Sequence, residues 1–393
     1  SMKIKNKGRK IYKTKEKNYY GKSPIGKLFS VMLTVVLIGG IGFLGYSVVG
    51  PMINYSRKKG DEEVTQPASQ EKTVTGTTGV NPDNAVSEVP ENQTEPYRSV
   101  RLNEYEIMNC EAIKTAISRI PQEQDIEYIE VPLKLPDGRL TYATAYEAIP
   151  EIVSSELTLS EITRTIKKEG YTPSAYISTF ADNTIPEIYP QYGYINPETV
   201  SVWRDSDSKI WASPFSESYM NYLKFIADEV SGAGFSKVIF ADIEFPEFTD
   251  RDLTLLNDSR LESSGRYTAL TDAADVLYDT VTANDSDMFI EVSASEVLSN
   301  RVEILRPLFI KTDTIILDIN LDEISHGVDT GNTVYDFSST PTENIVKMLD
   351  LLKDRVSDFN IVVCISGTAY NTSELLRAKD NIAELGYTSF ILG

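Results

Sequence analysis

The chain has 393 residues, of which 41% are hydrophobic and 24% are charged. This length is enough for one large domain with additions or for two ordinary domains, and the composition excludes a collagen-like or wholly disordered chain. The net charge is −20, while residues 1–27 alone carry +9, so the remainder carries −29. Such an acidic body repels nucleic-acid phosphates, and we expect no nucleic-acid partner.

An uncharged stretch follows the basic N-terminus. The 29 residues between Lys27 and Arg57 contain no Lys, Arg, Asp or Glu, and about 20 apolar residues suffice for a helix to cross a bilayer. We predict a basic cytoplasmic tail over 1–27 and a single transmembrane anchor helix over 28–53, with the rest of the chain extracytoplasmic because positive charge stays inside. A cleaved signal peptide is the alternative, although its apolar run is usually shorter.

A polar segment separates the anchor from the body. Residues 60–96 contain no Leu, Ile, Phe, Tyr or Trp and are rich in Thr, Glu, Pro and Asn. Such a segment cannot bury enough apolar surface to order itself. We predict a flexible extracytoplasmic linker over 54–97 and a folded domain over 98–393.

The body alternates short β-rich apolar runs with amphipathic helical patterns, which is typical of parallel β/α units. The runs predict eight strands, at 100–107, 126–134, 173–180, 237–245, 288–294, 314–321, 360–366 and 388–392. Helical patterns lie at 110–120, 159–169, 214–231, 266–284, 341–356 and 373–385. We predict a (β/α)₈ TIM barrel, whose functional groups sit at the C-terminal strand ends. A doubly wound open sheet is the alternative, because the chain ends at its eighth strand.

The two cysteines give little information about structure or function. Cys110 and Cys364 each lie in an apolar stretch, so a disulfide and two buried free thiols are both compatible with the sequence. Their spacing fits no metal or redox motif.

Carboxylates are the remaining candidates for chemistry. The chain has a single His and lacks a phosphate loop, a dinucleotide fingerprint and a nucleophile elbow, so we expect no cofactor and no metal. Glycoside hydrolysis can proceed on two carboxylates alone. The acidic residues near the C-terminal ends of the predicted strands are Glu130, Asp242, Glu244, Glu291, Glu296 and Asp318.

The densest acidic cluster is Asp242 and Glu244. Within a continuous strand these two residues would face the same side and project together. We predict them as the acid and base, or the acid and stabiliser, with Glu291 or Glu296 as a reserve partner. The alternative is that they point outward or cap a loop, as acidic strand ends often do.

Aromatic residues gather between the third and fourth predicted strands, and flat rings stack on the apolar faces of sugars. Tyr176, Trp203 and Trp211 are therefore predicted to bind substrate. The alternative for the two tryptophans is that they anchor a long loop.

The body resembles a bacterial family named "Putative glycosyl hydrolase domain", of TIM barrels distantly similar to amylase-type glycosidases. The resemblance rests on four segments, which are 134–142 (KLPDGRLTY), 175–182 (AYISTFAD), 203–215 (WRD to WASPF) and 232–246 (GAGFSKVIFADIEFP). It implies a barrel that acts on or binds a glycan. It also implies substrate-binding roles for Lys134 and Asp182, and for His326 through a weaker Ser-His match.

The sequence departs from the family pattern at acidic and basic positions. Family aspartates are replaced by Pro132, Ala241 and Ser295, and family arginines by Tyr176 and Glu244. The segment Asp242-Ile-Glu244-Phe-Pro246 also resembles the Asp-x-Glu-aromatic-Pro ending of chitinase-type barrels, where the Glu is the acid. These departures imply that catalytic acids have been lost or rearranged.

Two functions follow from these observations. The first is a membrane-anchored barrel that binds, and in its active form hydrolyses, a cell-wall or surface glycan. The second is a catalytically inactive barrel that serves as a scaffold or binds a protein partner in a cell-envelope complex.

Overall fold

A computed structural model describes residues 95–121, 125–300, 310–367 and 372–393 of the chain. The predicted cytoplasmic tail, the anchor over 28–53 and all but the last residues of the linker lie outside these ranges. No helix of the described ranges is long and apolar enough to cross a membrane.

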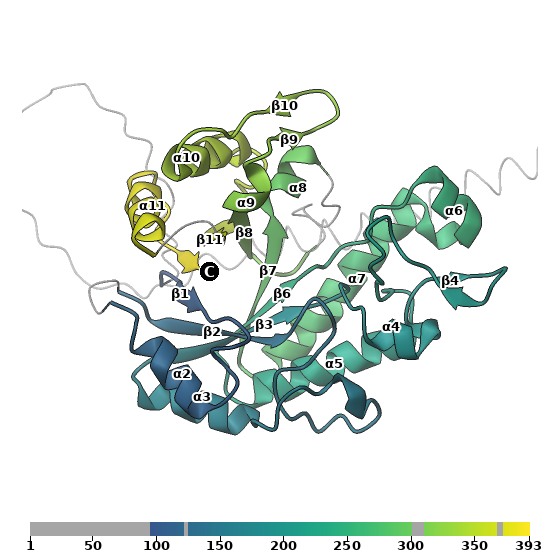
Figure 1. Ribbon diagram of the computed structural model, residues 1–393, viewed down its shortest axis with the longest axis horizontal. Coiled ribbons are helices and arrows are strands. Elements are labelled where there is room, and N and C mark those ends of the chain that lie inside the picture. Colours follow the sequence, from purple (N-terminus) through teal and green to yellow (C-terminus); the bar gives the residue numbers. More distant parts are fainter. Residues whose placement is uncertain (1–94, 122–124, 301–309, 368–371) are drawn as a thin grey trace, which may run out of the picture. The chain divides into compact units, whose positions relative to one another are not determined.

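Eight parallel strands close into a barrel in the order β1-β12-β11-β8-β7-β6-β3-β2 (Figure 1). Closure excludes the doubly wound alternative, because β1 pairs with both β2 and β12. The barrel strands are β1 (Arg98–Arg101), β2 (Tyr128–Lys134), β3 (Thr172–Ser178), β6 (Lys237–Ala241), β7 (Asp287–Ser293), β8 (Thr314–Asn320), β11 (Asn360–Ser366) and β12 (Phe390–Leu392).

Helices cover the outside of the barrel. Neighbouring pairs are α2 (Cys110–Ile117) with α3 (Leu159–Lys168), α5 (Glu217–Gly232) with α7 (Ser263–Thr282), and α10 (Pro341–Leu352) with α11 (Thr372–Glu384) (Figure 1). All six predicted helices and all eight predicted strands are thus present. The largest differences are that β1 spans 98–101 instead of 100–107, that β6 ends at 241 instead of 245 and that α10 ends at 352 instead of 356.

Shorter elements fill the connections and were not predicted. They are α4 (Ile185–Ile188), α6 (Asp250–Leu256), α8 (Ala294–Ser299), α9 (Leu321–Ile324), the hairpin of β4 (Ile195–Asn196) and β5 (Ser201–Val202), the hairpin of β9 (Val328–Asp329) and β10 (Val334–Tyr335), and three 3₁₀ turns at Pro150–Ile152, Pro190–Tyr192 and Ser259–Leu261.

Helix α5 illustrates how the sequence pattern becomes packing. Its buried side chains recur every three or four residues and face the barrel: Tyr219, Tyr222, Leu223, Ile226, Ala227 and Val230. Each large apolar side chain buried in this way contributes about 1.5–3 kcal/mol. The predicted start at Ser213 and Pro214 is three residues early, because the Ser216 hydroxyl accepts from the Tyr219 amide and caps the helix there.

The strands separate an inner core from an outer one. Inside the barrel pack Tyr97, Ile239, Phe289, Ile316, Val362, Cys364 and Ile391. Tyr97 belongs to this core although the sequence places it in the linker, and its hydroxyl lies 2.7 Å from the Ser174 hydroxyl. Cys364 is buried in the inner core and Cys110 begins α2, and both are free thiols.

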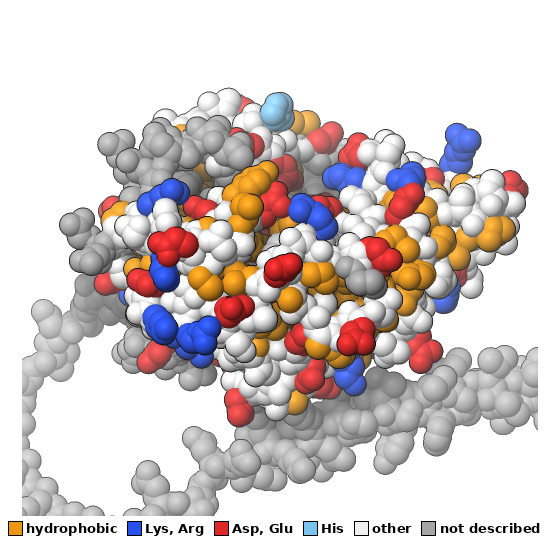
Figure 2. All heavy atoms as spheres, turned by 60° about the horizontal axis from the view of Figure 1, so that its bottom comes forward, with side chains coloured by type: hydrophobic (Ala, Val, Ile, Leu, Met, Phe, Trp, Pro, Cys, Tyr) orange, Lys and Arg blue, Asp and Glu red, His pale blue; other side chains and the backbone are white. Residues whose placement is uncertain are grey.

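Acidic, basic and apolar side chains are interspersed over the face of the molecule that Figure 2 shows. The barrel therefore presents a mixed surface there.

Candidate active site at the barrel mouth

Arg101 occupies the centre of the barrel at its C-terminal end. Its Nε donates to Oε1 of Glu130 on β2, and its two terminal nitrogens donate to the carboxylate of Glu291 on β7, with Nη1 to Oε1 at 3.1 Å. The guanidinium also stacks on Tyr176 of β3, 4.4 Å from the ring centroid. One arginine thus joins four strands through hydrogen bonds and ring contact.

Sequence reasoning missed Arg101. The available signal was that Ser99 and Arg101 alternate with Val100 in a short strand, so a charged residue faces the barrel interior. Because buried charges are almost always paired, such a residue predicts acidic partners on neighbouring strands.

Burial perturbs the inner carboxyl groups. It raises the pKa of Glu130 to about 7, against the opposing charge of Arg101. Burial, together with the charge of Glu291, raises the pKa of Asp318 on β8 to about 6. The Ser366 hydroxyl donates to Asp318 Oδ1 at 2.7 Å and partly offsets this effect. The barrel interior therefore holds more carboxyl groups than its arginine can neutralise.

Asp242 lies directly after β6 in a left-handed backbone conformation, with φ +54°. The prediction that Asp242 and Glu244 project from one face of a continuous strand is therefore wrong, since β6 ends at Ala241 and the backbone turns. The Ser178 hydroxyl donates to Asp242 Oδ2. Burial raises the pKa of Asp242, and this hydrogen bond opposes the rise.

Glu244 and Glu296 form a second acidic group at the mouth. Burial raises the pKa of Glu244 well above its usual value, and a hydrogen bond with the Glu296 carboxyl group reinforces the rise, as do the charges of Glu296, Asp242 and Glu323. These surroundings therefore favour the protonated form of Glu244. Glu296 reaches this position from α8, which follows β7 directly.

A pocket of about 250 Å³ opens beside this pair. Phe245, Pro246 and Phe248 supply its apolar lining, and Arg266 and Asn300 its further polar groups. A carboxyl group with a raised pKa beside a second carboxyl group is an arrangement that can hold a proton. The pair lies after the C-terminal ends of β6 and β7, on the face of a barrel where functional groups gather.

The predicted catalytic residues therefore divide into two groups. Glu291 is 7% exposed and held by Arg101, whereas the charge of Glu296 raises the pKa of both Asp242 and Glu244. The structure brings the latter three together at the mouth.

Lys134 and Asp182, predicted to bind substrate, are fully buried and pair with each other at 3.1 Å. The Asp182 carboxylate also accepts from the Thr184 and Ile185 amides and from the Tyr219 hydroxyl. A Cβ at Gly138 would lie 2.1 Å from Asp182 Oδ1. The prediction is wrong for this pair, because the ion pair fixes the hairpin after β2 and no sugar reaches it.

Trp203 is 5% exposed and packs against Tyr194 and Phe248, with its Nε1 donating to Asp252. The loop-anchoring alternative is thus correct for Trp203. Trp211 is half-buried at the edge of this aromatic cluster, and its Nε1 donates to Asp205 Oδ2 at 2.9 Å.

Two other predicted binding residues have different surroundings. Tyr176 lies beneath Arg101, where its ring supports the guanidinium, so a sugar cannot stack on that face. His326 is exposed in the loop after α9, and its Nδ1 lies 3.0 Å from the Ser325 hydroxyl.

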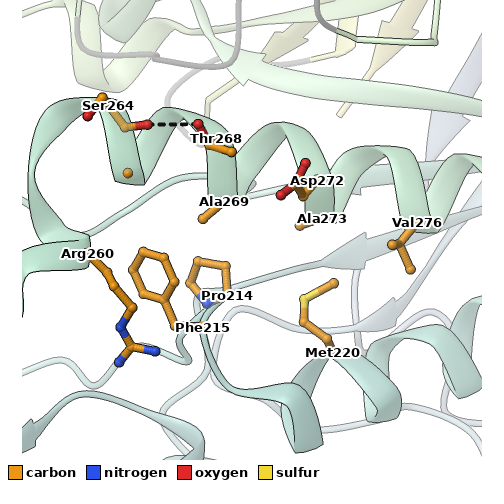
Figure 3. A pocket seen from close by; sticks show the side chains of 11 residues that line it. Pro214, Phe215, Met220, Arg260, Ser264, Thr268, Ala269, Asp272, Ala273 and Val276 are labelled. Atoms are coloured by element: carbon orange, nitrogen blue, oxygen red, sulfur yellow. Dashed lines mark hydrogen bonds between the residues drawn. The ribbon is translucent and has the colours of Figure 1, made fainter. Parts of the chain in front are cut away.

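Another cavity lies beside α5 on the outer wall of the barrel, away from the strand ends. It has a volume of about 500 Å³, and Figure 3 shows Pro214, Phe215 and Met220 opposite Ala269, Ala273 and Val276 of α7. It is lined by α7, by the segment that leads into α5 and by no barrel-strand residue, so it lies apart from the acidic groups of the mouth. Within the described ranges no group of three or more His, Cys, Asp or Glu residues is arranged to hold a metal ion.

Comparison with known structures supports the barrel assignment. The glycoside hydrolase domain of PgaB (BpsB) from Bordetella bronchiseptica superimposes with a TM-score of 0.55 at 15% identity, covering 76% of this chain and 94% of that domain. The glycoside hydrolase domain of a PelA variant from Pseudomonas aeruginosa gives a TM-score of 0.40 at 15% identity, with coverages of 76% and 94%. The likeness to the PgaB domain, at 15% identity, concerns the fold alone.

Sequence comparison identifies the family. No protein of curated function matches the chain. Residues 99–304, more than half of the chain, match the family described as "Putative glycosyl hydrolase domain". The chain therefore belongs to this family, and its folded body is a glycoside hydrolase-like barrel.

Proposed function

We propose that this protein is anchored in the cell membrane by residues 28–53, exposes its barrel outside the cell, and binds and cleaves a cell-wall or surface glycan at the barrel mouth. The observation that carries the proposal is the Glu244–Glu296 pair beside an open pocket, where burial and the hydrogen bond with Glu296 raise the pKa of Glu244.

In this mechanism Glu244 donates its proton to the leaving oxygen of the sugar bond as the bond from that oxygen to the anomeric carbon breaks. A water molecule then adds to this carbon, and the proton that the water loses restores the acid. A general acid needs a raised pKa, which burial and the neighbouring carboxylates supply. Asp242 is the candidate to stabilise positive charge that develops on the sugar ring, because it follows β6 directly and its charge acts on Glu244. The apolar faces of Phe245 and Phe248 line the pocket for the ring itself.

A second function has its own supporting observation. Arg101 pairs with Glu130 and Glu291 inside the barrel, which suits a barrel that binds a glycan or a protein partner without cleaving it. The envelope scaffold therefore remains the competing proposal.

The deciding experiment measures binding and product release by the full chain in detergent against peptidoglycan, chitin and soluble starch. Glu244→Gln removes the proton donor, and we expect it to lower cleavage by about 10²–10⁴-fold while leaving binding intact. Glu384→Gln makes the same chemical change on exposed α11 and serves as the matched control.

Each result has a distinct meaning. Cleavage that survives Glu244→Gln contradicts the assigned acid. Binding without cleavage by the wild type indicates a glycan-tethering protein, and neither binding nor cleavage favours the scaffold. Membrane topology is tested separately, because protease added to intact spheroplasts should remove the barrel if it lies outside.

A further inference from the structure

Tyr105 is an aromatic side chain that the fold exposes. It is 72% exposed, and Met108 beside it is 66% exposed. Both belong to the loop that joins β1 to α2. Because this loop follows the C-terminal end of a barrel strand, it lies on the same face as the acidic mouth.

Local hydrogen bonds hold this loop in a defined conformation. The Asn103 side chain accepts from the backbone amides of Tyr105 and Glu106, at 3.0 and 3.2 Å, and the Glu106 carboxylate accepts from the Asn103 amide at 3.0 Å. Arg119 pairs with Glu106 at 3.7 Å. A ring held on an ordered loop loses little conformational entropy when a ligand stacks on it.

A pocket of about 460 Å³ lies beside the ring, within the range of ordinary ligand sites. It is formed by the loops after β1 and β2 and is lined by Glu104, Tyr105, Ile107, Met108, Arg139, Thr141, Ser154, Ser155 and Glu156. An exposed ring thus adjoins hydroxyl, carboxylate and guanidinium groups, which is the combination that binds a sugar by stacking and by hydrogen bonds.

The charged groups of the pocket are partly available to a ligand. Arg139 donates through Nε to Asp137 and through Nη2 to Glu104, at 2.6 and 2.9 Å. These bonds orient the guanidinium and leave Nη1 without a bonded acceptor among the described residues. Glu156 is exposed and forms no hydrogen bond or ion pair with another described residue.

We propose that Tyr105, Arg139 and Glu156 form an additional sugar subsite of the glycan-binding face, in which one pyranose unit stacks on the Tyr105 ring while its hydroxyl groups bond to Arg139 and Glu156. The inference rests on the proposed function and extends it: the ligand is a polymer long enough to occupy both this subsite and the pocket at Glu244.

The test compares binding of the full-length wild type, Tyr105→Ala, Tyr105→Phe and Leu385→Ala to the glycan that the wild type retains from peptidoglycan, chitin and starch. Leu385 is 47% exposed at the end of α11, on the opposite end of the barrel, so Leu385→Ala removes an exposed apolar side chain without touching the subsite. We expect Tyr105→Ala to weaken polymer binding roughly tenfold and the other two variants to bind within about twofold of the wild type.

The outcomes separate this inference from the proposed function. Wild-type binding that Tyr105→Ala leaves unchanged overturns the subsite alone. A wild type that binds no glycan of the panel overturns the proposed function, and the subsite with it. Loss of binding in Leu385→Ala equal to that in Tyr105→Ala also overturns the subsite, because the ring would then have no specific effect.

Discussion

The barrel contains two groups of carboxyl side chains in contrasting environments, one inside it and one at its mouth. Glu130 and Glu291 surround Arg101, which donates to both and holds them closed to solvent. Glu244 and Glu296 share a hydrogen bond, and the charges that act most strongly on Glu244 are those of other carboxylates. The first group is therefore suited to hold the strands together and the second to hold and release a proton. Residue type alone does not distinguish them, since all four are glutamates.

The largest expected effect is the loss of folding stability when the cation of the first group, Arg101, is removed. Arg101→Met leaves Glu130 and Glu291 buried without a partner, and loss of one member of a buried pair costs about 3–5 kcal/mol. Urea unfolding at pH 7 measures this loss. The loss should shrink at pH 5, because carboxyl groups without a cation bind protons in the folded state more readily and protonation removes the buried charge.

Arg101→Lys is the matched control, since it keeps the charge but not the forked hydrogen bonds. The stability of Arg101→Lys should lie between those of the wild type and Arg101→Met. A stability of Arg101→Met equal to that of the wild type at pH 7 would contradict a supporting role for the arginine.

A smaller change in the free energy of unfolding is expected at Asp318. This residue lies next to the first group and has no cation of its own. Its pKa is about 6 in the folded protein, against about 3.9 in an unfolded chain. A raised folded-state pKa means that ionisation destabilises the fold: the penalty is absent below about pH 4, grows between pH 4 and 6, and is complete above this range.

Asp318→Asn removes this penalty and keeps an acceptor for the Ser366 hydroxyl. Because Asp318 is only partly buried, we expect a gain of about 1 kcal/mol at pH 8 and none at pH 4, measured by urea unfolding at both values. A gain of equal size at pH 4 would show that the effect does not come from ionisation.

The smallest expected effect is a shift in the pKa of Glu244, which belongs to the second group. Glu296→Gln removes the negative charge and the carboxyl partner that raise the pKa of Glu244. The pKa of Glu244 should therefore fall, and the pH at which cleavage declines on the basic side should move to a lower value. A titration of Glu244 followed by carbon-13 NMR gives the same shift without activity, and an unchanged pKa would refute the coupling.

The sequence by itself determined the barrel and its alternation of elements. Each strand carries a short β-branched run and each helix an apolar stripe, and both signals are local, so the eight strands and six main helices could be predicted. The carboxyl ends of parallel strands meet on one face of a barrel, which also placed Asp242, Glu244, Glu291 and Glu296 near the mouth.

Only the tertiary structure decided what these residues do. The left-handed backbone at Asp242 ends β6 and redirects Glu244, and the partner of Glu291 is Arg101, 190 residues away in the chain. Lys134 and Asp182 are far apart in the chain, yet they form an ion pair and are inaccessible to solvent. The ring of Tyr105 is exposed to solvent because the Asn103 side chain fixes its loop. Ionisation and accessibility depend on neighbours distant in sequence, and a local pattern carries no information about those neighbours.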